Sequence, residues 1–168
     1  MSRHFLLPAL LCLVMAQSPF ADEFSRQREQ LMTAIADLAT ETAAETGRPA
    51  FSAAVMAALT QVPRHRFVPL DQVPYAYENR PLAIGHGQTI SQPYIVALMT
   101  DLIDPRPDQT VLEIGTGSGY QAAVLAELVA QVHSIEIIAP LAEEAAARLK
   151  ALGYPNLQTR TGDGYYGW

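Results

Sequence analysis

The stretch EIGTGSGYQA, residues 113 to 122, constrains the fold more than any other, because it places three glycines within five positions directly after an apolar run. A glycine-rich turn between a strand and a helix lets the backbone approach a nucleotide-like ligand closely. The turn has two interpretations. From Gly115 it is G-x-G-x-G, whereas from Gly117 it is G-x-G-x-x-A, the dinucleotide-binding pattern ending at Ala122. The residues around the loop must decide between them.

Strand and helix patterns alternate around this loop. Buried strands are predicted at residues 110–114, 132–138 and 157–161. The intervening helices are predicted at residues 120–130 and from Pro140 to the stop at Gly153. Such alternation is typical of a parallel sheet with right-handed crossovers. We therefore predict an α/β fold with a Rossmann-like parallel sheet, preceded by an N-terminal helical segment.

The N-terminal segment itself predicts two helices and a long irregular stretch. One helix begins at Asp22 and stops at Gly47, and a shorter one follows and ends before Pro63. Residues 63–93 contain many prolines and glycines, and a breaker-rich segment of this length is often functional. Ser91 is predicted to cap the next helix. The inward face of that helix is predicted to be Ile95, Met99 and Leu102.

Residues 1–21 have the pattern of a secretory signal peptide. A positively charged start precedes an apolar run from Phe5 to Met15, which is too short to span a bilayer. Cleavage is predicted after Ala16, with Ala21 as a second candidate. We therefore expect export to the periplasm and no stable membrane association after the leader is removed. The alternative is a cytoplasmic location.

Composition excludes several partners and chemistries. The net charge is −6, which argues against nucleic acid as a partner, because phosphate binding needs clustered Lys and Arg. The only cysteine is Cys12, which lies in the predicted leader. The four histidines are scattered without the spacing of metal ligands, so no metal site is predicted.

An acid stands at the end of each predicted strand. Glu113, Glu136 and Asp163 should share one edge of the sheet, because ligands of such sheets bind beyond the carboxyl ends of the strands. Glu136 lies 21 residues after Gly115, the separation expected for an acid that holds ribose hydroxyls. Dinucleotide and S-adenosylmethionine sites share that feature, so Glu136 does not discriminate between them.

Glu113 does discriminate. It immediately precedes the loop, where a dinucleotide would place its pyrophosphate, and two negative charges would then meet in a poorly screened crevice. S-adenosylmethionine instead carries an ammonium and a sulfonium, and Asp163 is suitably placed for its adenine amino group. The sequence thus favours S-adenosylmethionine, with a structural tight turn as the alternative for the glycines. The predicted cofactor-binding residues are Glu113, Gly115, Thr116, Gly117, Gly119, Glu136, Asp163 and Gly164.

Four segments resemble the protein-L-isoaspartate O-methyltransferase family and occur in that family's order. They are VPRHRFVP (62–69), IGHGQTISQPYIVALMTDLI (84–103), VLEIGTGSGYQAAVLAEL (111–128) and GYPNLQTRTGDGYYGW (153–168). The GQTISQPY stretch is the specific part, because many methyltransferases share only the glycine loop. The resemblance implies a class I, S-adenosylmethionine-dependent methyltransferase domain over residues 22–168. Its helices and substrate loop would occupy 22–104 and its cofactor-binding part 105–168.

The resemblance also implies a reaction. In this family a methyl group passes from S-adenosylmethionine to the free α-carboxylate of L-isoaspartyl residues in damaged proteins, which is a step of protein repair. It implies that Ser91 is the catalytic residue and that Thr89, Ile90 and Gln92 line the substrate site. The implied partners are isoaspartyl-containing proteins or peptides.

Two departures from the family pattern leave alternatives open. The family continues past GDGYYGW with further strands, so we expect a truncated chain in which the C-terminal strands are missing and the first strand exposes an apolar edge. The predicted leader is the second departure, since most of the family is cytosolic. The alternatives are an inactive or weakly cofactor-binding fragment, or a methyltransferase for another small substrate.

Overall fold

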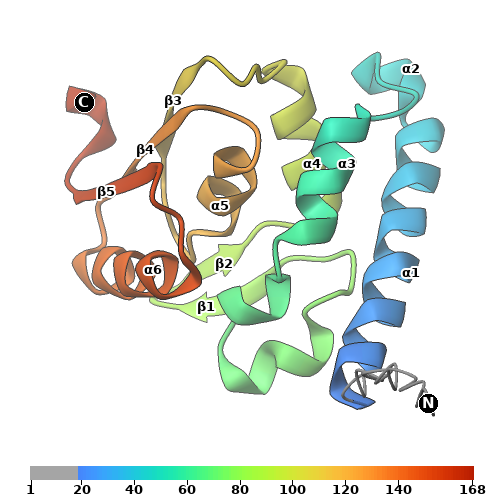
Figure 1. Ribbon diagram of the computed structural model, residues 1–168, viewed down its shortest axis with the longest axis horizontal. Helices are drawn as coiled ribbons and strands as arrows, with labels where there is room; N and C mark the ends of the chain where they lie inside the picture. Colours follow the sequence, from blue (N-terminus) through green and yellow to red (C-terminus); the bar gives the residue numbers. More distant parts are fainter. Residues whose placement is uncertain (1–18) are drawn as a thin grey trace, which may run out of the picture.

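The computed structural model describes the backbone of residues 19–168 and the side chains from residue 24 onward. Almost all of the predicted leader, residues 1–21, lies outside this part, so the leader remains a prediction. A helical half and an α/β half lie side by side (Figure 1). None of the helices within residues 19–168 is long and apolar enough to cross a membrane.

The helical half begins with two helices in line. Helix α1 spans Pro19–Glu41, so it starts before the predicted Asp22, and α2 spans Ala43–Thr46. Gly47 ends α2 with a φ of 68°, as predicted for the stop, but the single helix predicted up to Gly47 is divided at Thr42. Helix α3 spans Ala53–Gln61. Helices α1 and α3 contribute buried apolar side chains to one core, including Leu31, Ile35, Ala39, Val55 and Leu59.

Helix α4, Pro93–Leu102, differs from the prediction in its cap and in its buried face. Gln92, not Ser91, is the N-cap residue, and no side chain caps this helix end. The predicted inward residues Ile95, Met99 and Leu102 are 37%, 43% and 50% exposed. Apolar residues occur all round α4, so their periodicity could not choose the face. Packing against α1 and α3 buries the opposite face instead: Pro93, Tyr94, Val96, Ala97, Thr100 and Asp101.

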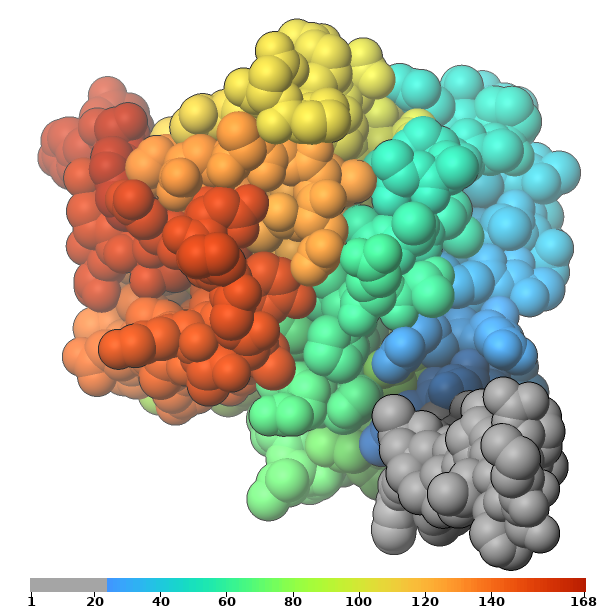
Figure 2. Space-filling view, in the orientation of Figure 1, coloured from blue at the N-terminus to red at the C-terminus, as the bar shows by residue number. Residues whose placement is uncertain are grey.

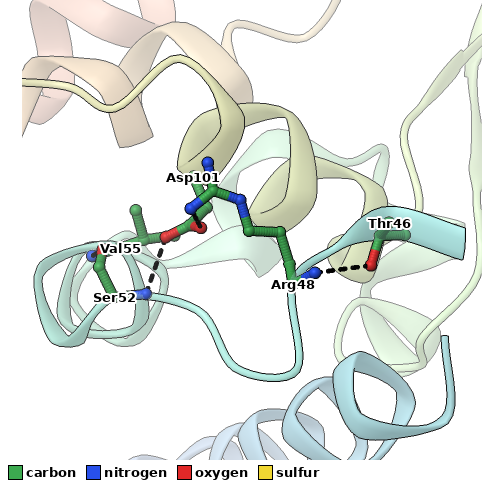
Figure 3. A network of polar contacts seen from close by, with 5 residues as sticks. All are labelled: Thr46, Arg48, Ser52, Val55 and Asp101. Atoms are coloured by element: carbon green, nitrogen blue, oxygen red, sulfur yellow. Dashed lines mark hydrogen bonds and ion pairs between the residues drawn. The ribbon is translucent and has the colours of Figure 1, made fainter. Parts of the chain in front are cut away.

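A buried carboxylate fastens α4 to the start of α3 (Figure 3). Asp101 Oδ1 accepts a hydrogen bond from the Ser52 N–H at 2.8 Å, and its Oδ2 lies 3.3 Å from Nη1 of Arg48. The Ser52 hydroxyl in turn accepts from the Val55 N–H, which caps α3. One acid therefore joins the segment before α3 to α4.

The breaker-rich segment is more ordered than predicted. Strand β1, Leu82–Gly85, and strand β2, Gln88–Ile90, form an antiparallel hairpin. The hairpin turns at His86, whose φ is 53°, between two glycines that also have positive φ. Buried and exposed residues alternate along β1. This period-two pattern is the sequence signal for a strand in a segment that was predicted to be irregular.

The predicted parallel sheet is confirmed. It contains β3 (Thr110–Ile114), β4 (Gln131–Glu136) and β5 (Leu157–Thr161), in the order β3-β4-β5. Helix α5, Tyr120–Ala126, connects the first pair of strands, and α6, Ala139–Leu152, connects the second. Helix α5 ends four residues before its predicted end at 130, and β4 ends two before 138.

Two further features set the surroundings of the sheet. Strand β3 lies at one edge of this sheet, as predicted, and its side chains Leu112 and Ile114, on one face of the strand, are 44% and 56% exposed. Helix α3 packs against α5, so the helical half and the α/β half share an interface. Figure 2 shows the two halves in continuous contact on the face that it presents.

We predict that Asp101→Asn lowers the free energy of unfolding by about 1–2 kcal/mol, because the amide keeps one acceptor but loses the charge that pairs with Arg48. Urea unfolding followed by far-UV circular dichroism measures the change. The control is Asp108→Asn, at an exposed position, which should stay within about 0.5 kcal/mol of the parent chain. Equal effects of the two substitutions would contradict the anchoring role of Asp101.

Candidate cofactor site

The glycine loop between β3 and α5 requires its glycines for two different reasons. Gly115, Gly117 and Gly119 have φ values of 93°, 53° and 85°, which other residues rarely adopt. A Cβ on Gly119 would meet a methyl of Leu149 at 3.0 Å, so the absence of a side chain at this position allows α6 to pack closely against the loop. A Cβ on Gly115 would meet no atom within 4 Å. Gly115 therefore presents an open backbone surface that a ligand can approach.

Glu136 braces this loop from the end of β4. Its Oε2 accepts from the Gly117 N–H at 2.8 Å, and its Oε1 accepts from the Ile138 N–H at 2.9 Å. The side chain is buried, and each oxygen keeps a further lone pair for another donor. The structure thus places Glu136 beside the loop as predicted and adds a bracing role. Its predicted contact with ribose hydroxyls remains a prediction.

Glu113 is held by the hydroxyl of Ser134, a residue of the neighbouring strand, which is held in turn by the hydroxyl of Thr116. Ser134 donates a hydrogen bond to Glu113 Oε2, and Thr116 in the loop donates to Ser134 Oγ at 2.6 Å. Burial raises the pKa of Glu113 to about 8, and the nearby Glu136 adds to this, while the Ser134 hydrogen bond opposes it. Glu113 is therefore largely protonated at neutral pH, and a cation beside it would favour the charged form.

The end of β5 reaches the same edge of the sheet. The Gly162 N–H donates to the Glu136 carbonyl at 2.9 Å, and a Cβ on Gly164 would collide with the side chain of Ile114. Asp163 is exposed, and its Oδ1 accepts from the Tyr165 N–H at 2.9 Å. The three predicted acids therefore stand at three neighbouring strand ends, as the parallel topology requires.

The predicted substrate segment lies against the glycine loop. A small cavity of about 60 Å³ is lined by Thr89, Ile90 and Ser91 on one side and by Gly115, Thr116 and Gly117 on the other. A larger cavity of about 390 Å³ also contains Ser91, together with Glu113 and Gly115. Ser91 thus borders both cavities, where the two predicted sites meet. Gln92 lines neither cavity and is the N-cap residue of α4, so its predicted place in the substrate wall remains a prediction.

Sequence reasoning missed several polar residues around the loop. Ser134 is fully buried in β4, and Gln121 in α5 donates to the Thr100 hydroxyl of α4 at 2.7 Å. Gln121 lines both cavities. The available signal was a polar residue inside an otherwise apolar strand or helix, since such residues are buried only with hydrogen-bond partners.

A parallel sheet with a glycine loop after its first strand and an acid after its second defines a Rossmann-like cofactor-binding domain. The family described as Protein-L-isoaspartate(D-aspartate) O-methyltransferase (PCMT) matches residues 42–168, three quarters of the chain. The chain therefore belongs to the protein-L-isoaspartate O-methyltransferase family, as its sequence motifs predicted.

Individual relatives support this assignment. Protein-L-isoaspartate O-methyltransferase 2 of Polaromonas sp. is 62% identical over 138 residues, which cover 82% of this chain and 65% of that protein. Protein-L-isoaspartate O-methyltransferase 1 of Cupriavidus necator is 55% identical over 168 residues, which cover 97% of this chain and 65% of that protein. The chain thus spans a little under two thirds of the length of these two relatives.

Solved structures agree on the fold. A protein-L-isoaspartate O-methyltransferase is 31% identical with a TM-score of 0.68, and the match covers 84% of this chain and 44% of that one. A putative family member from Plasmodium falciparum, solved with S-adenosyl-L-homocysteine, is 22% identical with a TM-score of 0.61, over 82% of this chain and 62% of that one. The second likeness concerns the fold alone.

The raised pKa of Glu113 predicts a pH dependence of stability. Between pH 5 and pH 8 the folded state keeps a proton that the unfolded state has lost, so the free energy of unfolding should fall as the pH rises. Glu113→Gln removes this titration, so it should flatten the fall and stabilise the chain at pH 8 relative to the parent. Urea unfolding at pH 5 and pH 8 measures both effects.

The matched control for this prediction is Glu127→Gln, at an exposed position just after α5. It should leave the pH dependence of the parent chain unchanged. If Glu113→Gln shows the same slope between pH 5 and pH 8 as the Glu127 variant, Glu113 is ionised in the folded chain and the prediction is wrong.

Proposed function

We propose that the glycine loop and the three strand-end acids bind S-adenosylmethionine. The open surface over Gly115 fits a ligand in close backbone contact, and Glu113 beside it fits a ligand that brings positive charge. Glu136 and Asp163 would hold the ribose and adenine parts. When bound, this cofactor supplies a methyl group activated by a sulfonium. The Plasmodium falciparum neighbour of the same fold was solved with the demethylated form of the cofactor, which supports the proposal.

The reaction that this site supports best is methyl transfer to the α-carboxylate of L-isoaspartyl residues in damaged proteins. The observation that carries this proposal is the position of Ser91, which borders the same cavities as the glycine loop. The names of the relatives and membership of the family add to it. Isoaspartyl-containing proteins or peptides are then the partners, and the activity is a step of protein repair.

Methyl transfer to a carboxylate needs little acid–base catalysis from the protein. A carboxylate is already a nucleophile, so the site must align it with the methyl donor and exclude water. The exposed hydroxyl of Ser91 can donate a hydrogen bond to the acceptor carboxylate. The buried side chains of Ile90 and Val96 form an apolar wall of the small cavity. Thr89 lies at the exposed rim, where it would contact the bound peptide.

Cofactor binding is tested with Gly115→Ala. The substitution strains a backbone at φ 93° and places a methyl on the open ligand surface, so we expect the affinity for S-adenosylhomocysteine to fall at least about tenfold. Isothermal titration calorimetry measures it. The matched control is Gly153→Ala, at the end of α6, where φ is 82° and a Cβ also meets no atom within 4 Å. Equal affinity of the two variants would contradict the assignment of the loop.

Methyl transfer is tested with labelled cofactor and two peptides that differ only in an isoaspartyl or aspartyl residue. We expect label in the isoaspartyl peptide alone. Ser91→Ala should lower kcat/KM about tenfold or more, because it removes one oriented hydrogen bond. Thr60→Ala, on an exposed position of α3, should match the parent chain. Equal label in both peptides would contradict the repair function.

A second candidate is weak cofactor binding without turnover. The exposed side chains of Leu112 and Ile114 on one face of β3 favour it, because an uncovered apolar face beside the site leaves β3 poorly packed. Heat of S-adenosylhomocysteine binding without methyl transfer to either peptide is the result that this candidate predicts. Methylation of a small molecule alone would indicate a different substrate class.

For location, we propose export to the periplasm with removal of the leader, on the basis of the apolar run from Phe5 to Met15. The alternative is the cytoplasm, as is usual for the family. N-terminal sequencing of the protein from periplasmic and cytoplasmic fractions tests this. A periplasmic protein that begins after Ala16 or Ala21 supports export, and an intact Met1 in the cytoplasmic fraction contradicts it.

A further inference from the structure

Arg64 is a fully buried arginine that joins segments distant in the sequence. It lies in a short 3-10 helix, Arg64–Phe67, and none of its surface is exposed. Its Nε donates to the carbonyl of Ala76 at 2.9 Å, and its Nη2 donates to the carbonyl of Ser91 at 2.8 Å. The second bond holds the backbone of the residue proposed to orient the acceptor carboxylate.

The same guanidinium contacts the helix that follows the glycine loop. Its central carbon lies 4.8 Å from the ring centroid of Tyr120, the first residue of α5. That ring is buried, and it meets Phe67 edge to face at a centroid distance of 5.5 Å. Through Tyr120, one side chain therefore connects the Ser91 segment to the end of the glycine loop.

The charge of Arg64 is not neutralised in the usual way. Within residues 24–168, no carboxylate forms an ion pair with it, although buried charges are normally paired. Burial lowers its pKa, while Tyr120 opposes this, and its Nη1 is buried without a hydrogen-bond partner. Burying a cation is costly, and an apolar residue of similar size would fill the space more cheaply. Beyond packing, the arginine supplies hydrogen bonds to the two carbonyls and a contact with the Tyr120 ring.

We propose that Arg64 is a positioning residue for methyl transfer, which holds Ser91 at a fixed place relative to the glycine loop. This inference rests on the proposed function of Ser91. The geometry calls for arginine in particular. The planar guanidinium directs two N–H groups to two carbonyls and offers its face to a ring, whereas a lysine ammonium acts as a single point charge.

Two variants of the full chain test the proposal, Arg64→Lys, which keeps the charge, and Arg64→Met, which removes every donor. The matched control is Arg66→Met, because Arg66 lies two residues away in the same 3-10 helix and is exposed. Each variant is assayed for thermal unfolding, affinity for S-adenosylhomocysteine, and kcat and KM with an isoaspartyl peptide. Hydrogen–deuterium exchange compares residues 88–92 with residues 131–136 of β4.

For Arg64→Lys we expect cooperative unfolding and a cofactor affinity within about threefold of the parent. We expect kcat to fall about ten- to a hundredfold, because loss of alignment lowers the rate more than it weakens binding. Exchange in residues 88–92 should rise about tenfold or more, while β4 keeps its protection. Arg66→Met should match the parent in all four measurements. This pattern supports positioning, and Arg64→Lys decides alone if Arg64→Met does not fold.

Two results would overturn the proposal. One is an unchanged kcat and unchanged exchange in residues 88–92 of Arg64→Lys. The other is evidence that Arg64 only stabilises the fold, which is either a joint loss of β4 protection, cofactor affinity and kcat, or failure of Arg64→Lys to fold. If the parent chain shows no methyl transfer, the proposed function fails, and the exchange comparison still decides whether Arg64 holds the Ser91 segment.

Discussion

The site depends on the continuation of the β3–β4 pairing into the glycine loop. The last pairing of the two strands joins Ile114 to Ile135, and the Gly115 N–H then donates to the Ile135 carbonyl at 2.7 Å. The Glu136 side chain takes the Gly117 N–H two residues later. The loop is therefore an extension of the sheet, with its backbone donors used against β4 and its open face at Gly115 directed away from the packed atoms.

This arrangement explains why the acids at the strand ends have different environments. Glu136 accepts the backbone N–H groups of Gly117 in the loop and of Ile138 just before α6. Glu113 receives only the Ser134 hydroxyl, and burial raises its pKa to about 8. Asp163 is exposed at the third strand end. The three acids thus occupy equivalent positions in the topology but differ in environment: Glu136 holds the loop, Glu113 has a raised pKa, and Asp163 is exposed to solvent.

Prediction from the sequence worked where local pattern and tertiary structure agree. The strands at 110–114 and 157–161, the glycine loop and the stop at Gly153 follow from runs of apolar residues and from positions where only glycine is unstrained. The prediction of the buried face of α4 was wrong because apolar residues occur on all sides of this helix. Only packing against α1 and α3 selects the face that is buried. The β1–β2 hairpin was missed because its strands are only four and three residues long.

By itself, the sequence determined the family, the α/β class and the order of the glycine loop and its acids, because these depend on residue types at fixed spacing. Only the tertiary structure decided which groups meet across that spacing. Ser134 reaches Glu113 because the parallel register pairs the two residues, and Arg64 reaches Ser91, 27 residues away, because its 3-10 helix packs against the end of the β1–β2 hairpin. Contacts between distant segments depend on how whole elements pack, which no local pattern of residues records.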